Sequence, residues 1–484
     1  MRAVRVSQAR PLTRIDLRLS TLLVTLLASC STSPADAPGD AASPAGAAAT
    51  VRVFEGARLI TGERTPVIED SAIVVQGDRF TEVGRKGAVE IPEGAARIDV
   101  TGKTIMPAMV DMHSHLGFLK AVDGTMAKEN FTRENLIDHL QRYAYHGFAA
   151  VISVGTDMGD LPYQLREEVI PDAALFRTVG RGLAWPGSGP GDPARNDVPY
   201  SVTTEEEARA AVRDLAPHRP SFVKIWVDDR NGRAKKLTPP LFTAAIDEAT
   251  KLGLPSIAHV FDLEDAKGLV RAGTVGFTHL VRDADMDDEL IGLLKARPNV
   301  FFIPNIGITA RGLEEGRPKW LDDPLLHETI APSQIEPLVR NFSDRKPEVL
   351  ARTREDWDRA KRNIAKLRAN GVPIVYGSDS AGDPSRLLGW HAVWELQSLV
   401  MAGIPADEAI VDATSVAANA LNLGDRLGSV AVGKSADFIV LDANPLDDIA
   451  SSRRINKVFL RGQEVNRAAL RAKWQAEWSA RTTQ

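Results

Sequence analysis

The chain has 484 residues, a net charge of −5, 44% hydrophobic and 25% charged residues, which is an ordinary globular composition. This composition excludes a largely disordered protein, and the length is sufficient for a large barrel and a smaller domain. The negative charge argues against a nucleic-acid partner. The only cysteine is Cys30, so a disulfide within the chain is excluded.

Residues 1–29 resemble a bacterial lipoprotein signal peptide. Five arginines precede an apolar run at residues 19–28, which is too short to span a bilayer but suits a secretory signal. The run ends in the letters LASC, and small residues before a cysteine resemble the lipobox, where that cysteine is acylated and becomes the new N-terminus. We therefore expect lipidation at Cys30; cleavage elsewhere, with Cys30 as a free thiol, is the alternative.

The segment that follows, residues 30–50, is rich in Ala, Pro, Ser, Gly and Asp and lacks aromatic residues. This composition predicts a disordered tether. Removal of residues 1–29 takes away five Arg and one Asp, which lowers the net charge to about −9. We expect an exported cell-envelope lipoprotein that meets the membrane only through its lipid. Because Ser31 rather than Asp follows the cysteine, the outer membrane facing the periplasm is the expected location.

The two ends of the remaining chain carry short alternating apolar runs, which predict β-strands. Residues 51–104 contain several such runs separated by glycine-containing turns, and residues 425–465 contain a matching set. We expect these two segments to form a small flanking β-sandwich. Residues 466–484 are expected to form a C-terminal helix or tail.

Between these ends, at residues 105–424, apolar strand patterns alternate with helical patterns. The strand patterns cover residues 110–115, 149–154, 175–179, 222–227, 256–260, 274–279, 300–304 and 373–378. Eight strands with helices between them predict an α/β fold with a (β/α)₈ TIM-like barrel. A doubly wound sheet is the alternative, but no glycine-rich phosphate turn follows an early strand.

Two connections, residues 180–200 and 305–353, are long for barrel loops, and such loops at the carboxyl ends of strands commonly line a pocket. We expect them to supply apolar and cationic groups for a substrate. The candidates are Trp185, Trp320 and Phe342 for an apolar wall, and Arg282, Arg311 or Arg317 for a carboxylate.

Four histidines and an aspartate lie at expected strand ends, where barrel active sites are built. His113 and His115 are two residues apart on one strand, so their side chains share a face and can share a metal. His259, His279 and Asp379 each end another strand. Asp379 can bind a cation and exchange a proton with bound water. Asp262 and Asp383 lie further into loops and rank lower.

Lys224 is a single cation inside the apolar strand at residues 222–227. Burying an unpaired ammonium costs several kcal/mol. The neutral amine can instead react with carbon dioxide to give a carbamate, an anion that can bridge two cations. In the alternative register, Lys224 points outward toward a helix carboxylate.

Together these segments resemble the amidohydrolase superfamily, in its imidazolonepropionase-like and Xaa-Pro dipeptidase-like branch. Residues 106–115 (MPAMVDMHSH) are similar to the first-strand motif, 377–380 (GSDS) to the strand-eight Gly-Thr-Asp motif, and 428–438 (GSVAVGKSADF) to the return into the flanking sheet. Ala108 and Met109 replace the usual Gly-Leu, and His279 is followed by Leu280 where many members have Gly. These departures affect the expected substrate more than metal binding.

The resemblance implies six metal ligands: His113, His115, Lys224, His259, His279 and Asp379. It implies two divalent cations, N6-carboxylysine at Lys224, and a metal-bridging hydroxide that attacks a carbonyl while Asp379 transfers the proton to the leaving nitrogen. The ligand set favours zinc, with manganese and iron also compatible. The implied substrate is a small amide, such as an N-acyl amino acid or a dipeptide.

Two other functions remain open from the sequence. A mononuclear deaminase or cyclic-amide hydrolase of the same superfamily would use His113, His115, His259 and Asp379 and leave Lys224 structural. A lipid-anchored, non-catalytic binding protein is the third interpretation. The exact substrate, the metal, the substrate-binding residues and the oligomeric state do not follow from the sequence.

Overall fold

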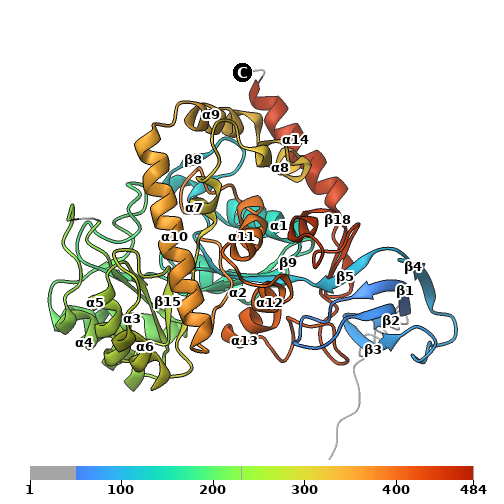
Figure 1. Cartoon of the computed structure of the whole chain (residues 1–484), viewed down its shortest axis with the longest axis horizontal. Coiled ribbons are helices and arrows are strands. Elements are labelled where there is room, and N and C mark those ends of the chain that lie inside the picture. Colours follow the sequence, from blue (N-terminus) through green and yellow to red (C-terminus); the bar gives the residue numbers. More distant parts are fainter. Residues whose placement is uncertain (1–50, 231, 483–484) are drawn as a thin grey trace, which may run out of the picture. The chain divides into compact units, whose positions relative to one another are not determined.

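In the computed structural model, residues 51–230 and 232–482 are described (Figure 1). The expected signal peptide, the lipidation site at Cys30 and the tether at residues 30–50 lie outside the described residues. Within the described part, none of the helices combines the length and the apolar character that crossing a membrane requires.

The first and last strands of the described chain share one sheet, in the order β19-β18-β17-β5-β1-β2-β3, with β4 paired to β1. β17 pairs antiparallel with β5, which joins the two ends of the chain. Phe438 and Phe459 stack on this sheet with ring centroids 4.6 Å apart. The expected sandwich of two facing sheets stays a prediction. The strands are β1 (Val51–Leu59), β2 (Ile68–Gln76), β3 (Arg79–Arg85), β4 (Ala96–Asp99), β5 (Thr104–Pro107), β17 (Phe438–Leu441), β18 (Ile455–Leu460) and β19 (Gln463–Glu464).

The central strands form two sheets in which every pairing is parallel, in the orders β10-β9-β6 and β12-β11-β13-β14-β15-β16. Most of these strands are buried along their whole length, as expected where helices cover a parallel sheet. Their bounds are β6 (Met109–Ser114), β9 (Phe148–Ser153), β10 (Leu175–Thr178), β11 (Leu183–Ala184), β12 (Tyr200–Ser201), β13 (Val223–Val227), β14 (Ser256–Val260), β15 (Gly276–Thr278) and β16 (Phe301–Ile303). A separate hairpin joins β7 (Leu119–Lys120) and β8 (Thr125–Met126).

Seven of the eight predicted barrel strands are regular strands, and the eighth, at residues 373–378, is not. This segment and the two residues after it instead make single bridges, from Ile374 to β16 and from Ser380 to Ser114 of β6. Its backbone turns at Asp379, where φ is +59°, and a left-handed residue ends extended pairing. The segment therefore contacts both parallel sheets without a continuous ladder.

Helices α3, α4, α5 and α6 pack one against the next, α4 and α5 also contact β14, and the long helix α10 packs against α7 (Figure 1). The helices are α1 (Arg133–Tyr145), α2 (Leu161–Arg166), α3 (Glu205–Leu215), α4 (Pro239–Lys251), α5 (Leu263–Ala272), α6 (Asp288–Lys295), α7 (Gly307–Arg311), α8 (Pro324–Thr329), α9 (Pro332–Ser343), α10 (Pro347–Ala369), α11 (Trp390–Met401), α12 (Ala406–Val411), α13 (Ala417–Ala420) and α14 (Arg467–Thr482). A capping box of Thr204 and Glu207 begins α3.

The connection after β16, expected to be a long loop, is largely helical, because α7, α8, α9 and the start of α10 lie in it. Its aromatic residues belong to the interior. The ring of Trp320 lies 5.1 Å from Trp390 and 5.5 Å from Phe342. The prediction that Trp320 and Phe342 form a substrate-facing wall is therefore wrong, because Trp320 packs against Trp390 of α11, Phe342 packs against Trp320, and both rings are buried.

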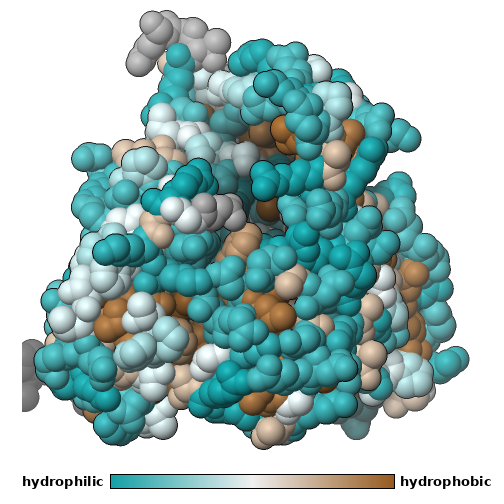
Figure 2. Space-filling view, turned by 60° about the vertical axis from the view of Figure 1, so that its left-hand side comes forward, coloured by the Kyte–Doolittle hydropathy of each residue, from teal (hydrophilic) through white to brown (hydrophobic). Residues whose placement is uncertain are grey.

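On the face shown in Figure 2, the surface is largely hydrophilic and hydrophobic side chains gather only in small, separated patches. Among the described residues, the exposed large hydrophobic side chains include Val169 and Val432, which are distant in sequence. Scattered residues of this kind are normal on a soluble surface. This face therefore offers no broad apolar docking surface.

Candidate metal centre

Four histidines meet at the carboxyl ends of the parallel strands. His113 lies on β6, His115 just after it, His259 on β14 and His279 just after β15. Ring centroids are 5.1 Å apart for His113 and His115, 5.2 Å for His113 and His279, and 4.5 Å for His259 and His279. All four are buried, so the strand topology brings distant parts of the sequence into one site.

Asp379 joins this cluster. One carboxylate oxygen lies 3.2 Å from Nε2 of His115 and 3.8 Å from Nε2 of His113, and the other lies 3.7 Å from Nε2 of His279. The ligand atoms of His113, His279 and Asp379 all lie within 4.8 Å of one another. His279 and Asp379 both have left-handed backbones, with φ of +72° and +59°. Such strain in non-glycine residues is typical of functional sites.

The donor atoms of His113 fit a cation. Its Nδ1 lies 2.8 Å from Oδ1 of Asn305, while its Nε2 is buried without a hydrogen-bond partner. Because an amide oxygen only accepts, Nδ1 carries the proton and Nε2 keeps a free lone pair. Nδ2 of Asn305 donates to the Gly377 carbonyl at 2.6 Å, which fixes the amide orientation. This pair therefore presents Nε2 as a ligand.

The histidines are held in the neutral form that binds metals. Burial lowers the pKa values of His113, His115 and His279 well below their ordinary value. Burial also lowers the pKa of His259 to about 3, although the hydrogen bond to Asp228 opposes this effect. At neutral pH the imidazoles therefore do not have to lose a proton before they bind a cation.

Lys224 faces the same site. Its side chain is fully buried, its Nζ donates to Oγ1 of Thr278, and it lies 5.3 Å from the ring of Trp226. Burial, with a smaller contribution from Arg230, lowers the pKa of Lys224 well below its ordinary value. The alternative in which Lys224 pairs with a helix carboxylate is wrong, because its partner is a hydroxyl on β15. A neutral amine at this position can react with carbon dioxide.

Asp228 orients His259. Nε2 of His259 lies 2.9 Å from Oδ2 of Asp228 and 3.1 Å from Nη2 of Arg282. Because a guanidinium only donates, one Nε2 cannot serve both partners, and the Nε2–H tautomer satisfies the carboxylate. Arg282 then faces Asp228 itself, at 3.8 Å. Nδ1 of His259 is left as the free nitrogen, as in a carboxylate–histidine–metal arrangement.

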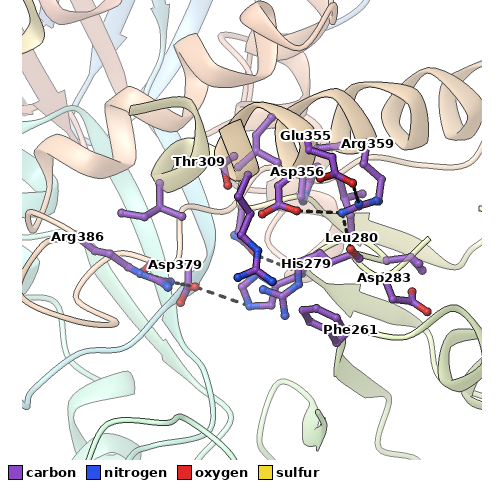
Figure 3. Close-up of a pocket in the computed structure, with 18 residues that line it drawn as sticks. Phe261, His279, Leu280, Asp283, Thr309, Glu355, Asp356, Arg359, Asp379 and Arg386 are labelled. Carbon is purple, nitrogen blue, oxygen red and sulfur yellow. Dashed lines mark hydrogen bonds and ion pairs between the residues drawn. The ribbon is translucent and has the colours of Figure 1, made fainter. Parts of the chain in front are cut away.

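Two cavities meet at this site. The smaller, about 250 Å³, is lined by metal-ligand candidates and by Arg195, Arg230, Arg282 and Arg386. The larger, about 510 Å³, extends from His279 and Asp379 toward α10, where Asp356 and Arg359 lie (Figure 3). Arg386 forms ion pairs with Asp379 and with Asp383, the latter at 2.8 Å. Both cavities are therefore open to the candidate metal ligands.

Of the other candidates, Arg282 and Asp383 line the site. Asp262 pairs instead with Lys236. Arg317 is about half exposed and pairs with Asp322 at 2.7 Å, so the prediction that it binds a substrate carboxylate is wrong. The remaining two, Arg311 and Trp185, are absent from the linings of both cavities.

Four residues of the site were missed from the sequence: Asp228, Asn305, Arg195 and Arg386. Asp228 directly follows β13, and Asn305 follows the predicted strand at residues 300–304, so the strand-end rule that found the histidines could have found both. Arg195 and Arg386 lie in irregular loops, where no local pattern marks them.

The sequence matches the amidohydrolase family over residues 104–465, which is most of the chain. The protein therefore belongs to the amidohydrolase family and is a metal-dependent hydrolase that acts on carbon–nitrogen bonds. Its relatives include an imidazolonepropionase, and its structural neighbours include a Xaa-Pro dipeptidase, in agreement with the resemblance given above.

Two curated relatives and one solved structure show the breadth of this family. The chain is 24% identical to the imidazolonepropionase of Stenotrophomonas maltophilia, over 84% of this chain and 95% of that protein. It is also 24% identical to a 5-methylthioadenosine/S-adenosylhomocysteine deaminase of Symbiobacterium thermophilum, over 81% of this chain and 85% of that protein. A Xaa-Pro dipeptidase whose crystal structure has methionine bound in the active site is 23% identical in sequence, with a TM-score of 0.66, over 86% of this chain and 99% of that chain. This likeness supports a mixed α/β, TIM-like barrel.

Proposed function

We propose that the protein hydrolyses the carbon–nitrogen bond of a small amide that bears a carboxylate, such as an N-acyl amino acid or a dipeptide. The observation that carries this proposal is the placement of neutral histidines, Lys224 and Asp379 beside an arginine-lined cavity. Family membership supports the reaction class. The arginines support the charge of the substrate, because guanidinium groups bind carboxylates through paired hydrogen bonds.

Six side chains would hold two divalent cations: His113, His115, Lys224 as its carbamate, His259, His279 and Asp379. Zinc suits this set of imidazoles and carboxylates. The free Nε2 of His113 and the burial of Lys224, which lowers the pKa of its amine, support the assignment. When bound, two cations would supply positive charge that lowers the pKa of a water molecule and polarises the carbonyl of the substrate.

Asp379 would move the proton in the proposed reaction. Arg386 forms an ion pair with its carboxylate, and an ionised carboxylate can accept a proton. Passing that proton to the leaving nitrogen avoids expulsion of an amide anion. Asn305 and Asp228 hold His113 and His259 in the tautomers described above.

A second candidate is a mononuclear deaminase or cyclic-amide hydrolase. The hydrogen bond from Lys224 to Thr278 is compatible with a purely structural lysine, and one relative is named a deaminase. This enzyme would hold one cation at His113, His115, His259 and Asp379. The two candidates differ in metal count and in product.

The discriminating experiment uses the metal-loaded protein with a panel of N-acetyl amino acids, dipeptides and heterocyclic amines. We expect release of free amino acids and close to two equivalents of divalent metal per chain by elemental analysis. Release of ammonia from a heterocycle by an enzyme with one equivalent would support the deaminase. A metal-loaded protein that cleaves nothing in the panel would support a non-catalytic binding protein.

We also infer a closed barrel and an exported, lipid-anchored protein. The bridges from residues 373–380 to both β16 and β6 support closure. The arginine-rich N-terminus, the apolar run and the letters LASC before Ser31 support lipidation at Cys30 and an outer-membrane location facing the periplasm.

A further inference from the structure

We propose that Arg195 binds the substrate carboxylate in the smaller cavity, so that the amino-acid half of the substrate lies there and the acyl half lies in the larger one. This inference rests on the proposed function. Arg195 comes from the connection between β11 and β12 and is 2% exposed. Neither the family relationship nor the sequence pattern assigns it a role.

The guanidinium of Arg195 has unused donors. Its Nη2 donates to the Gly382 carbonyl, while Nε and Nη1 are buried without a hydrogen-bond partner. In the described part of the chain, Arg195 forms no ion pair with a carboxylate within 4.0 Å. A buried cation with two unsatisfied N–H groups is unfavourable unless an anion completes it. A carboxylate accepts two hydrogen bonds from one guanidinium and fits this need.

The neighbouring arginines already have anionic partners. Arg386 pairs with Asp379 and Asp383, and Arg230 and Arg282 face Asp228 at 3.6 and 3.8 Å. Arg195 differs from them because Asp192 and Asp383 act on it only through longer-range electrostatic interaction, without an ion pair. Burial lowers the pKa of Arg195 to about 10, so it keeps its charge at neutral pH. Among the four arginines that line the smaller cavity, Arg195 is therefore the one without a carboxylate partner in the described part of the chain.

The two cavities set the direction of the substrate. They share His279, Arg282, Asp379 and Arg386, so the bond to be cleaved belongs at their junction. The smaller cavity, at about 250 Å³, holds Arg195 and suits an amino-acid residue. The larger, at about 510 Å³, has an apolar side that suits an acyl group (Figure 3). Its apolar lining includes Phe261, Leu280, Val281, Ile306 and Ile308. The expected substrates are N-acyl amino acids whose acyl group is the bulkier part.

The test compares Arg195→Met with the unaltered, metal-loaded enzyme on N-acyl amino acids and on the same compounds with the carboxylate converted to an amide. We expect KM for the acids to rise about tenfold to hundredfold in the variant, because hydrogen bonds to a charged group are lost. The kinetics on the amides and the metal content are expected to stay unchanged. Arg317→Met, on the exposed surface, is the matched control and is expected to leave KM for the acids, the kinetics on the amides and the metal content unchanged.

Binding provides a readout that does not depend on turnover. Calorimetry with N-acetylglycine and N-acetylglycinamide should show that the unaltered protein prefers the acid and that Arg195→Met does not. Equal preference in both proteins would overturn the role of Arg195 even if amides are hydrolysed. If Arg195→Met does not fold, the unaltered enzyme decides, because equal activity on acids and amides also overturns the inference. If the unaltered protein binds the acid in preference to the amide but hydrolyses neither, the result would count against the proposed function and not against the role of Arg195.

Discussion

Nδ1 of His113 and Oδ1 of Asn305 lie 2.8 Å apart, and this hydrogen bond determines which nitrogen of His113 faces the metal centre. The same oxygen accepts from the backbone N–H of His279 at 3.3 Å. Asn305 therefore positions two candidate ligands that come from different strands.

Removing this amide should weaken metal binding without removing a ligand. We expect Asn305→Ala to lower metal affinity about tenfold to hundredfold, the usual effect of losing a partner that orients a ligand. Asn305→Asp retains the acceptor and should bind metal more tightly than the alanine variant. Competition with a chromogenic chelator measures both. Equal affinity in Asn305→Ala and the unaltered protein would contradict this role.

Lys224 should be required for the second metal equivalent. We expect Lys224→Ala to lose activity and about one equivalent of metal, because no carbamate can form, and short carboxylic acids should partly restore both. In the unaltered protein, labelled bicarbonate should give a carbamate signal by ¹³C NMR. Lys251→Ala, on the exposed face of α4, is the control. Near-normal activity and metal content in Lys224→Ala would disprove the carbamate.

The proton-transfer role of Asp379 predicts a large effect on turnover. Asp379→Asn keeps the shape of the side chain but cannot accept the proton, so kcat should fall roughly a hundredfold or more. Asp262→Asn, which removes an acid paired with Lys236 outside the site, should leave kcat near normal. Steady-state kinetics at saturating metal tests both. A small effect in Asp379→Asn would shift the role to Asp383.

Acid should destabilise the metal-free protein through its buried histidines. Burial lowers the pKa of His259 from 6.5 to about 3. His259 therefore binds a proton below about pH 6.5 in the unfolded chain, but only below about pH 3 in the folded chain. The stabilisation is fully present above pH 6.5 and falls, by about 1.4 kcal/mol per pH unit, as the pH drops through this window.

The measurement is chemical denaturation of the chelator-treated protein at pH 7 and pH 5. His259→Gln removes the titrating group, so its free energy of unfolding should fall less between these two values. The same fall in both proteins would show that His259 does not contribute.

Cys30 should carry the lipid. We expect Cys30→Ser to leave an unprocessed or soluble precursor, because a hydroxyl replaces the thiol that is acylated. Membrane fractionation and labelling with a radioactive fatty acid measure this, and Ser33→Ala serves as the control. Membrane association that is unchanged in Cys30→Ser would disprove the lipid anchor.

The sequence by itself determined the parts of the protein that follow from local pattern. Buried-strand periodicity located seven regular strands, and the rule that active-site residues end barrel strands located His113, His115, His259, His279 and Asp379. It also singled out Lys224, because a lone cation in an apolar strand is costly to bury unpaired. Periodicity alone predicted a regular strand at residues 373–378. The left-handed turn at Asp379, which interrupts the pairing, depends on contacts with other strands and has no local pattern.

The tertiary structure decided everything that depends on the meeting of distant segments. Trp320 and Phe342 are aromatic residues of the kind that line pockets, but Trp320 packs against Trp390 of α11 and Phe342 packs against Trp320, so both lie in the interior. Arg195 carries no local signal, and its significance arises only because folding buries two of its N–H groups beside the histidines. Strand periodicity reports which residues are buried, whereas the partners of a buried charge are fixed by loops whose geometry depends on the whole fold.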